Sequence, residues 1–173
     1  MKNLPIEYCA VPIILLTIAL ILNYPAIASS PNEQNPIENE EKSQGLNPAI
    51  ALKQRGRQKL QRQDYQGAIA DFSQSILLNP DLADSYYYRG LIRAELEDQL
   101  GAISDFDDAI LKDPHHSWAY YHRAGVFFNL GNRSEGILDL QLAARLFREQ
   151  GNTVAYQKVE ALLNHFGVMI SVP

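Results

Sequence analysis

Apolar residues in the middle of the chain recur at helical spacing in three consecutive blocks. The blocks cover residues 49–82, 83–116 and 117–150, and they align without gaps. Large apolar residues mark the fourth and twenty-fourth positions of each block, and small residues mark the eighth, twentieth and twenty-seventh. The large ones are Leu52, Tyr86, Tyr120, Phe72, Phe106 and Leu140. Each block therefore predicts two helices with apolar faces that pack together, the small residues allowing a close approach.

The ends of the predicted helices differ between the blocks. Pro80 and Pro114 end the second helix of the first two blocks, because the residue before proline is disfavoured in helical geometry. Arg148 replaces proline in the third block, so its second helix is expected to continue toward Gln150. Gly151 then predicts a helix stop, and a seventh helix is expected over residues 152–165.

This tandem pattern resembles the tetratricopeptide-repeat (TPR) family. The resemblance implies an all-α fold over residues 49–165, an α-solenoid of three TPR helical hairpins plus a C-terminal capping helix. Residues 166–173 would form an apolar tail. That tail and an incompletely capped first helix both allow self-association.

The resemblance also implies a binding groove for a protein or peptide, lined by the first helix of each repeat. The family's groove positions fall on Lys53, Arg57, Leu60, Tyr87, Leu91, Trp118, Tyr121 and Phe128. The basic residues would receive an acidic side chain or a terminal carboxylate, and the aromatic residues would anchor the partner. As an alternative, the basic residues form a helix face that contacts only solvent. As further alternatives, Tyr87, Tyr121 and Phe128 would pack between repeats, and Trp118 would pack under a loop. A carboxylate clamp for chaperone tails is not expected, since only Lys53 has the residue type that it needs.

Arginine at the seventh position and aspartate at the twenty-third recur in every block. They predict three ion pairs between the helices of a hairpin: Arg55–Asp71, Arg89–Asp105 and Arg123–Asp139. We expect these pairs to set the register of each hairpin, with partner contact as the alternative role.

The N-terminal residues have the pattern of an export signal. Residues 11–22 are almost purely apolar, and Ala26-Ile27-Ala28 is the small-x-small sequence that signal peptidase accepts. We expect a signal peptide over residues 1–28 and an exported protein, in the periplasm, the thylakoid lumen or the extracellular space. Lys2 is the only basic residue before the run, so an uncleaved membrane anchor over residues 10–28 is the alternative. Membrane association is expected only in that case.

Residues 29–48 combine three prolines with an acidic run, and we expect a disordered linker there. The signal and the linker are typical of a bacterial protein. The formal net charge of −5 argues against binding to nucleic acid, which needs a basic surface.

The candidates for chemistry are few. Cys9 is the single cysteine, so no disulfide can form within one chain. His115, His116 and His122 suggest a metal site, but no Cys, Asp or Glu completes a set at ligand spacing, and we expect these histidines in turns or on the surface. His165 is expected in the capping helix. No metal, cofactor or enzymatic activity is predicted, because the sequence has no phosphate-binding loop and no nucleophile elbow.

The sequence therefore favours a protein–protein interaction scaffold or adaptor that binds a peptide or protein outside the cytoplasm. One alternative is a membrane-anchored assembly factor for a membrane protein complex. Another is a metal-dependent activity that uses the histidines.

Overall fold

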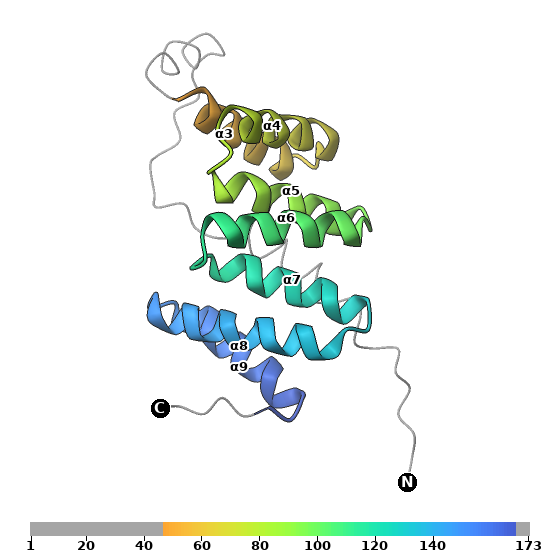
Figure 1. The fold of residues 1–173 in the computed structure, drawn as a ribbon, viewed down its shortest axis with the longest axis vertical. Coiled ribbons are helices and arrows are strands. Elements are labelled where there is room, and N and C mark those ends of the chain that lie inside the picture. Colours follow the sequence, from red (N-terminus) through yellow and green to blue (C-terminus); the bar gives the residue numbers. More distant parts are fainter. Residues whose placement is uncertain (1–46, 169–173) are drawn as a thin grey trace. The chain divides into compact units, whose positions relative to one another are not determined.

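The computed structural model describes residues 47–168, so the expected signal peptide, most of the linker and residues 169–173 lie outside the described part. Residues 47–168 form seven helices and no strand (Figure 1). They are α3 (Pro48–Gln61), α4 (Tyr65–Leu78), α5 (Ala83–Glu95), α6 (Gln99–Lys112), α7 (Ser117–Asn129), α8 (Arg133–Glu149) and α9 (Thr153–His165). The predicted all-α fold of three helical hairpins and a closing helix is confirmed.

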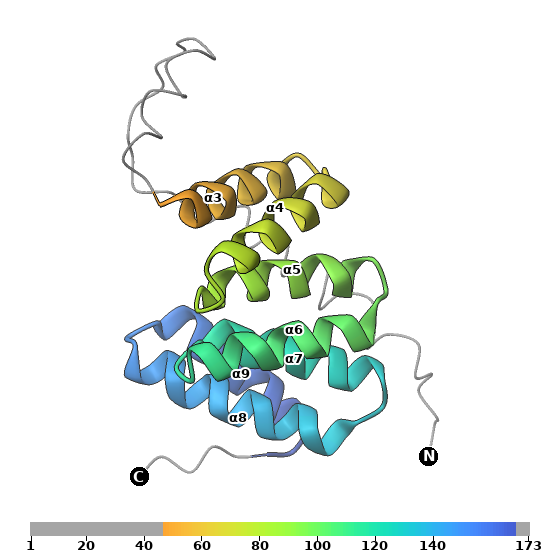
Figure 2. The same cartoon turned by 45° about the horizontal axis from the view of Figure 1, so that its top comes forward.

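The chain divides into two compact units after Pro80. Unit 1 is the hairpin of α3 and α4, described over residues 47–80. Unit 2 covers residues 81–168 and holds two hairpins, α5 with α6 and α7 with α8, followed by α9. Figure 2 shows α5 and α6 side by side, joined by a short turn.

Polar side chains cap the first backbone N–H groups of five helices. The capping residues are Asn47, Asp64, Asp98, His116 and Asn152. Asn47 caps α3, which begins at Pro48, the last residue of the expected linker. Proline fits this first helical position because its missing N–H would have no partner within the helix.

Proline ends α4 and α6 as the sequence predicts. The residues before the two prolines, Asn79 and Asp113, are extended, with φ and ψ of −145° and 96° and of −136° and 94°. Each extended residue stops the helix at its predicted end. In the third hairpin α8 continues to Glu149, and Gly151 with a φ of +72° turns the chain into α9.

Glycines on the first helices of two hairpins let phenylalanine rings lie against the backbone. A Cβ atom on Gly56 would be 2.9 Å from Cε1 of Phe72, and one on Gly90 would be 2.9 Å from Cε1 of Phe106. Both rings are fully buried. The close approach predicted from the eighth and twenty-fourth positions is therefore present in both hairpins.

In the third hairpin the phenylalanine lies on the first helix and the glycine on the second. Ala124 on α7 stands at the eighth position, and the glycine is Gly136 on α8, where a Cβ atom would be 2.9 Å from the ring of Phe128. The buried faces of α8 and α9 complete the core of unit 2 around Phe147, Val159 and Leu163. The expected closing helix thus covers the last hairpin with buried apolar residues.

We expect Gly90→Ala to lower the free energy of unfolding by about 1 kcal/mol, although alanine is the better helix former. The added methyl group would meet the Phe106 ring at 2.9 Å and Cβ of Asp105 at 3.1 Å, and both side chains are buried. Urea unfolding followed by circular dichroism measures the change. Gly125→Ala is the control, because no atom lies within 4 Å of its added methyl group. Equal stability of the Gly90 variant and the unmodified protein would contradict the packing argument.

Within residues 47–168, none of the helices combines the length and the apolar composition that a membrane crossing requires.

Candidate functional site

The three Arg–Asp pairs predicted from the repeats are all present in the structure. Each arginine on a first helix donates two hydrogen bonds or more to the aspartate on the second helix of its hairpin. The shortest distances are 2.8 Å for Arg55–Asp71, 2.6 Å for Arg89–Asp105 and 2.8 Å for Arg123–Asp139. The aspartates are buried at the contact between the helices, which fits a structural role for these pairs.

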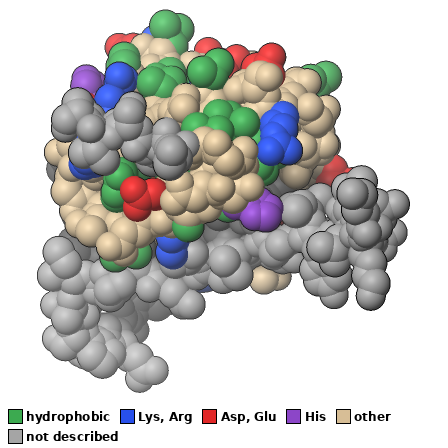
Figure 3. Space-filling view, turned by 90° about the horizontal axis from the view of Figure 1, so that it is seen from below, with side chains coloured by type: hydrophobic (Ala, Val, Ile, Leu, Met, Phe, Trp, Pro, Cys, Tyr) green, Lys and Arg blue, Asp and Glu red, His purple; other side chains and the backbone are tan. Residues whose placement is uncertain are grey.

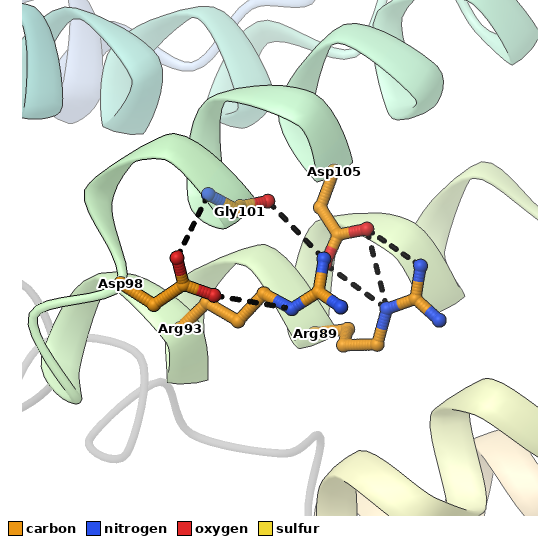
Figure 4. A network of polar contacts seen from close by, with 5 residues as sticks. All are labelled: Arg89, Arg93, Asp98, Gly101 and Asp105. Carbon is orange, nitrogen blue, oxygen red and sulfur yellow. Dashed lines mark hydrogen bonds and ion pairs between the residues drawn. The ribbon is translucent and has the colours of Figure 1, made fainter.

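Asp105 has the most enclosed of these carboxylates, with 1% of its side chain exposed. Figure 4 shows that a second arginine, Arg93, also reaches it, at 2.9 Å. Arg93 further donates to the Gly101 carbonyl at 3.3 Å and lies 3.8 Å from Asp98, the cap of α6. The buried charge is therefore held by two guanidinium groups, and that of Arg93 also connects it to the start of the second helix.

The second cation on Asp71 and on Asp105 was not predicted from the sequence. Lys59 lies 3.0 Å from Asp71 in unit 1, at the position that Arg93 has in unit 2. Burial alone would raise the pKa of Asp71, but its hydrogen bonds from Arg55 and Lys59 outweigh burial and lower that pKa. The recurrence of a basic residue at the eleventh position of two blocks was the signal for this contact.

In the third hairpin the arginine, and not the buried aspartate, has the second partner. Phe127 stands at its eleventh position, and Arg123 pairs with Asp107 of the preceding α6 as well as with Asp139. One arginine thereby joins the two hairpins of unit 2.

The basic groove residues predicted in unit 1 lie at the surface of α3. Arg57 is exposed, and Lys53 and Leu60 are partly buried. Lys53 and Arg57 are one helical turn apart and so share one face of α3. This face is separate from the Arg55 and Lys59 side chains that bind Asp71. It presents positive charge at the surface.

The two groove residues predicted on α5 lie in the interior. Tyr87 is 5% exposed and Leu91 is 6% exposed. The Tyr87 ring packs 4.6 Å from the ring of His116, 5.7 Å from that of His122 and 6.2 Å from that of Phe106. The structure therefore corresponds to the alternative for Tyr87, packing between repeats, and neither side chain offers surface to a partner.

The groove residues predicted on α7 divide into two groups. Phe128 stacks on Phe166 at 4.7 Å and faces Gly136, so it fills the space between α7, α8 and the end of α9. Trp118 and Tyr121 are partly buried and meet edge to face at 5.7 Å. Burial raises the pKa of the Tyr121 hydroxyl. These two rings keep part of their surface exposed on α7.

The expectation that His115, His116 and His122 lie in turns or on the surface is wrong for His122. Its side chain is buried among the rings of Tyr87, Phe106, Trp118 and Tyr121. Burial, with a smaller effect of His116, lowers the pKa of His122 to about 3. Within residues 47–168, no hydrogen-bond partner reaches its Nε2 atom. His122 is therefore neutral in the folded protein at physiological pH.

The remaining histidines have other surroundings. His116 caps α7 by accepting a hydrogen bond from the Ala119 N–H at Nδ1, and its Nε2 atom lies 3.4 Å from Asp84. His115 and His165 are exposed. In the part of the chain that the structure describes, no group of three or more His, Cys, Asp or Glu side chains could hold a metal ion.

Exposed leucines are present on the second helices of unit 2. Leu100 and Leu111 of α6 and Leu138 of α8 are all more than half exposed. On the face drawn in Figure 3, hydrophobic side chains are scattered among polar and charged ones. Isolated exposed apolar residues are normal on protein surfaces, so these leucines do not by themselves indicate a binding site.

Comparison with known proteins supports the TPR resemblance. Residues 56–97 match a protein-family model described as a TPR repeat. No curated protein sequence is similar to the chain.

Solved structures with this fold include complexes with peptides. The TPR2B domain in the pHsp70 complex of yeast Sti1 is 23% identical, with a TM-score of 0.63 over 66% of this chain and 92% of that chain. The second TPR of Spaghetti (RPAP3), bound to the HSP90 peptide SRMEEVD, is 25% identical, with a TM-score of 0.56 over 63% and 98%. The type III secretion translocator chaperone SycD of Yersinia enterocolitica is 18% identical, with a TM-score of 0.64 over 78% and 99%.

Proposed function

We propose that this protein with the TPR fold is a scaffold or adaptor that binds a peptide or an extended protein segment outside the cytoplasm. The TPR match and the two similar structures described with a peptide or in a complex support a binding role. The location rests on the export signal expected in residues 1–28, from the sequence alone.

The observation that carries the proposal is the division of side chains on the first helices. The cations at the seventh and eleventh positions, such as Arg89 and Arg93, are used inside the hairpins by buried aspartates. The charged side chain of Arg57 on α3 is exposed, and the aromatic ring of Tyr121 on α7 keeps part of its surface exposed. Exposed charged and aromatic surface on the first helices can contact a partner.

The surfaces of the two units suit different chemical groups. Lys53 and Arg57 can donate charge-assisted hydrogen bonds to an acidic side chain or a terminal carboxylate. Trp118 and Tyr121 offer flat, rigid rings, which are favoured anchors at protein interfaces. Both kinds of contact are reversible and need no catalytic group.

A triple variant, Lys53→Glu, Arg57→Glu and Tyr121→Ala, is expected to bind the partner at least about tenfold more weakly. The charge reversals repel an acidic group, and the alanine removes an anchor. The full chain captures proteins from an extract of the source cells, and each captured protein is then purified and its affinity measured directly. Circular dichroism checks that the variant stays helical.

Arg145→Glu with Arg148→Glu is the matched control, since it reverses two exposed charges on α8. The control should bind as the unmodified protein does. Equal affinity of the triple variant for every captured protein would mean that partners bind elsewhere, and the proposed surfaces would be wrong.

A further inference from the structure

The exposed side of α3 consists of arginine and glutamine alone. After the first turn, every exposed residue of this helix and of its C-cap is Arg or Gln, and the helix contains no Asp or Glu. At 3.6 residues per turn these positions fall within one half of the helix circumference. We call them the arginine–glutamine face; they are Gln54, Arg55, Arg57, Gln58, Gln61 and Arg62.

The positive charge of this face is not balanced within its hairpin. Residues 47–80 carry five Lys or Arg and two Asp, a formal net charge of +3. One of the two carboxylates, that of Asp71, is buried and already paired with Arg55 and Lys59, and Arg55 still has 59% of its side chain exposed. Within residues 47–168, Arg62 forms no ion pair. The hairpin therefore presents an excess of positive charge on one helix side, which attracts carboxylates.

An acidic run precedes this helix in the chain. Residues 29–46 have a formal net charge of −3, and Glu38, Glu40 and Glu41 stand six to nine residues before Asn47, the cap of α3. Six residues of extended chain span about 20 Å. The 14 residues of α3 form a helix about 21 Å long. A chain that turns back at Asn47 is therefore long enough to bring these carboxylates to any arginine of the face.

The tether favours this occupant over an acidic segment of another molecule. A short connection holds a ligand at an effective concentration on the order of millimolar, without any new contact. Arginine suits the contact because its planar guanidinium group binds a carboxylate through two hydrogen bonds. Single ion pairs at a surface are weak, so the contact needs several carboxylates together with the tether.

We infer that the acidic run at residues 38–41 docks on the arginine–glutamine face of α3. The contact itself goes beyond the proposed function and needs no partner. Its consequence rests on that function, because Arg57 belongs both to this face and to the surface proposed for an acidic group of a partner. The docked run competes with that group, and a partner has to displace the run before it binds unit 1.

A nitroxide label within the acidic run measures the contact in the full chain. The label is attached to Asn39→Cys in a Cys9→Ser background, so that it has a single site. Paramagnetic relaxation of backbone amides is then recorded by NMR. We expect enhanced relaxation along α3 as far as Gln61 and Arg62, at the end of the helix remote from the tether.

A neutral variant separates docking from the effect of the tether alone. It carries Glu38→Gln, Glu40→Gln and Glu41→Gln, which keep the length of the chain and remove the charges. The relaxation enhancement at the end of α3 should fall about threefold or more. The matched control removes three exposed carboxylates of unit 2 and should leave the enhancement unchanged; it carries Glu97→Gln, Glu135→Gln and Glu149→Gln.

The opposite side of the contact is tested in the same way. Arg57→Gln with Arg62→Gln should lower the enhancement as the neutral variant does, since both arginines are exposed and glutamine keeps the helix. Equal enhancement in the parent chain and the neutral variant would mean that the tether alone brings the label near, and the inference would be overturned. An absence of enhancement at the end of α3 in the parent chain would overturn it as well. Because no partner is present, neither result bears on the proposed function, which the capture experiment tests separately.

Discussion

Asp105→Ala is expected to lower the free energy of unfolding by about 3 kcal/mol, one of the largest effects of any single side chain in unit 2. The substitution removes a carboxylate that is 1% exposed and leaves the guanidinium groups of Arg89 and Arg93 without it. Arg89 keeps only 16% of its side chain exposed, so water cannot fully replace the lost partner. Urea unfolding followed by the fluorescence of Trp118, the single tryptophan, measures the change within unit 2.

Asp107→Ala provides the comparison for Asp105. Asp107 also pairs with an arginine, Arg123, but 53% of its side chain is exposed. An ion pair at the surface contributes about 1 kcal/mol or less, so this variant should be close to the unmodified protein. Equal free energies of unfolding for Asp105→Ala and Asp107→Ala would mean that burial does not determine how much these ion pairs contribute to stability.

Unit 2 is expected to lose about 2 kcal/mol of stability between pH 6.5 and pH 4.5 because of His122 alone. The pKa of His122 is lowered to about 3 in the folded protein, from 6.5 when the side chain is in water. The unfolded chain therefore binds a proton as the pH falls below 6.5, and the folded chain does not. The effect is absent well above pH 6.5, where His122 is neutral in both states, and the destabilisation grows as the pH falls from there toward 3.

His122→Phe should remove this dependence, because phenylalanine keeps a ring among Tyr87, Phe106 and Trp118 and cannot be protonated. Urea unfolding at a series of pH values between 7 and 4.5 gives the slope for each protein. His165→Gln, at an exposed position, should leave the slope as it is. The lowered pKa of Asp71 acts below about pH 4, outside this window. An unchanged slope in His122→Phe would show that other groups cause the acid sensitivity.

The local features of the fold could be predicted from the sequence because each depends on residues that recur every 34 positions. Gly90 and Phe106 predicted a close helix contact, and Pro114 predicted the end of a helix. The Arg–Asp pairs followed from the same alignment, since their two members stand at a constant separation in every block. Such features are set within one hairpin and repeat with it.

The surroundings of individual aromatic residues could not be predicted in this way. Tyr87 is buried by rings that come from residues about 20 to 35 positions later, His116 and His122 among them. A position in the repeat shows which face of the helix a side chain occupies, but not how large the neighbouring side chains in the next hairpin are. Tyr87 and Phe128 were therefore expected at a binding surface and instead complete the interior.

The double contact of Arg123 has a consequence for how unit 2 comes apart. Stacked repeats can in general open one at a time, since each touches only its neighbours. Arg123 binds Asp139 in its own hairpin and Asp107 in the preceding one, so separating the two hairpins removes a partner from the same guanidinium group. The junction between α6 and α7 thus gains nearest-neighbour coupling, which favours opening of the two hairpins as one cooperative segment.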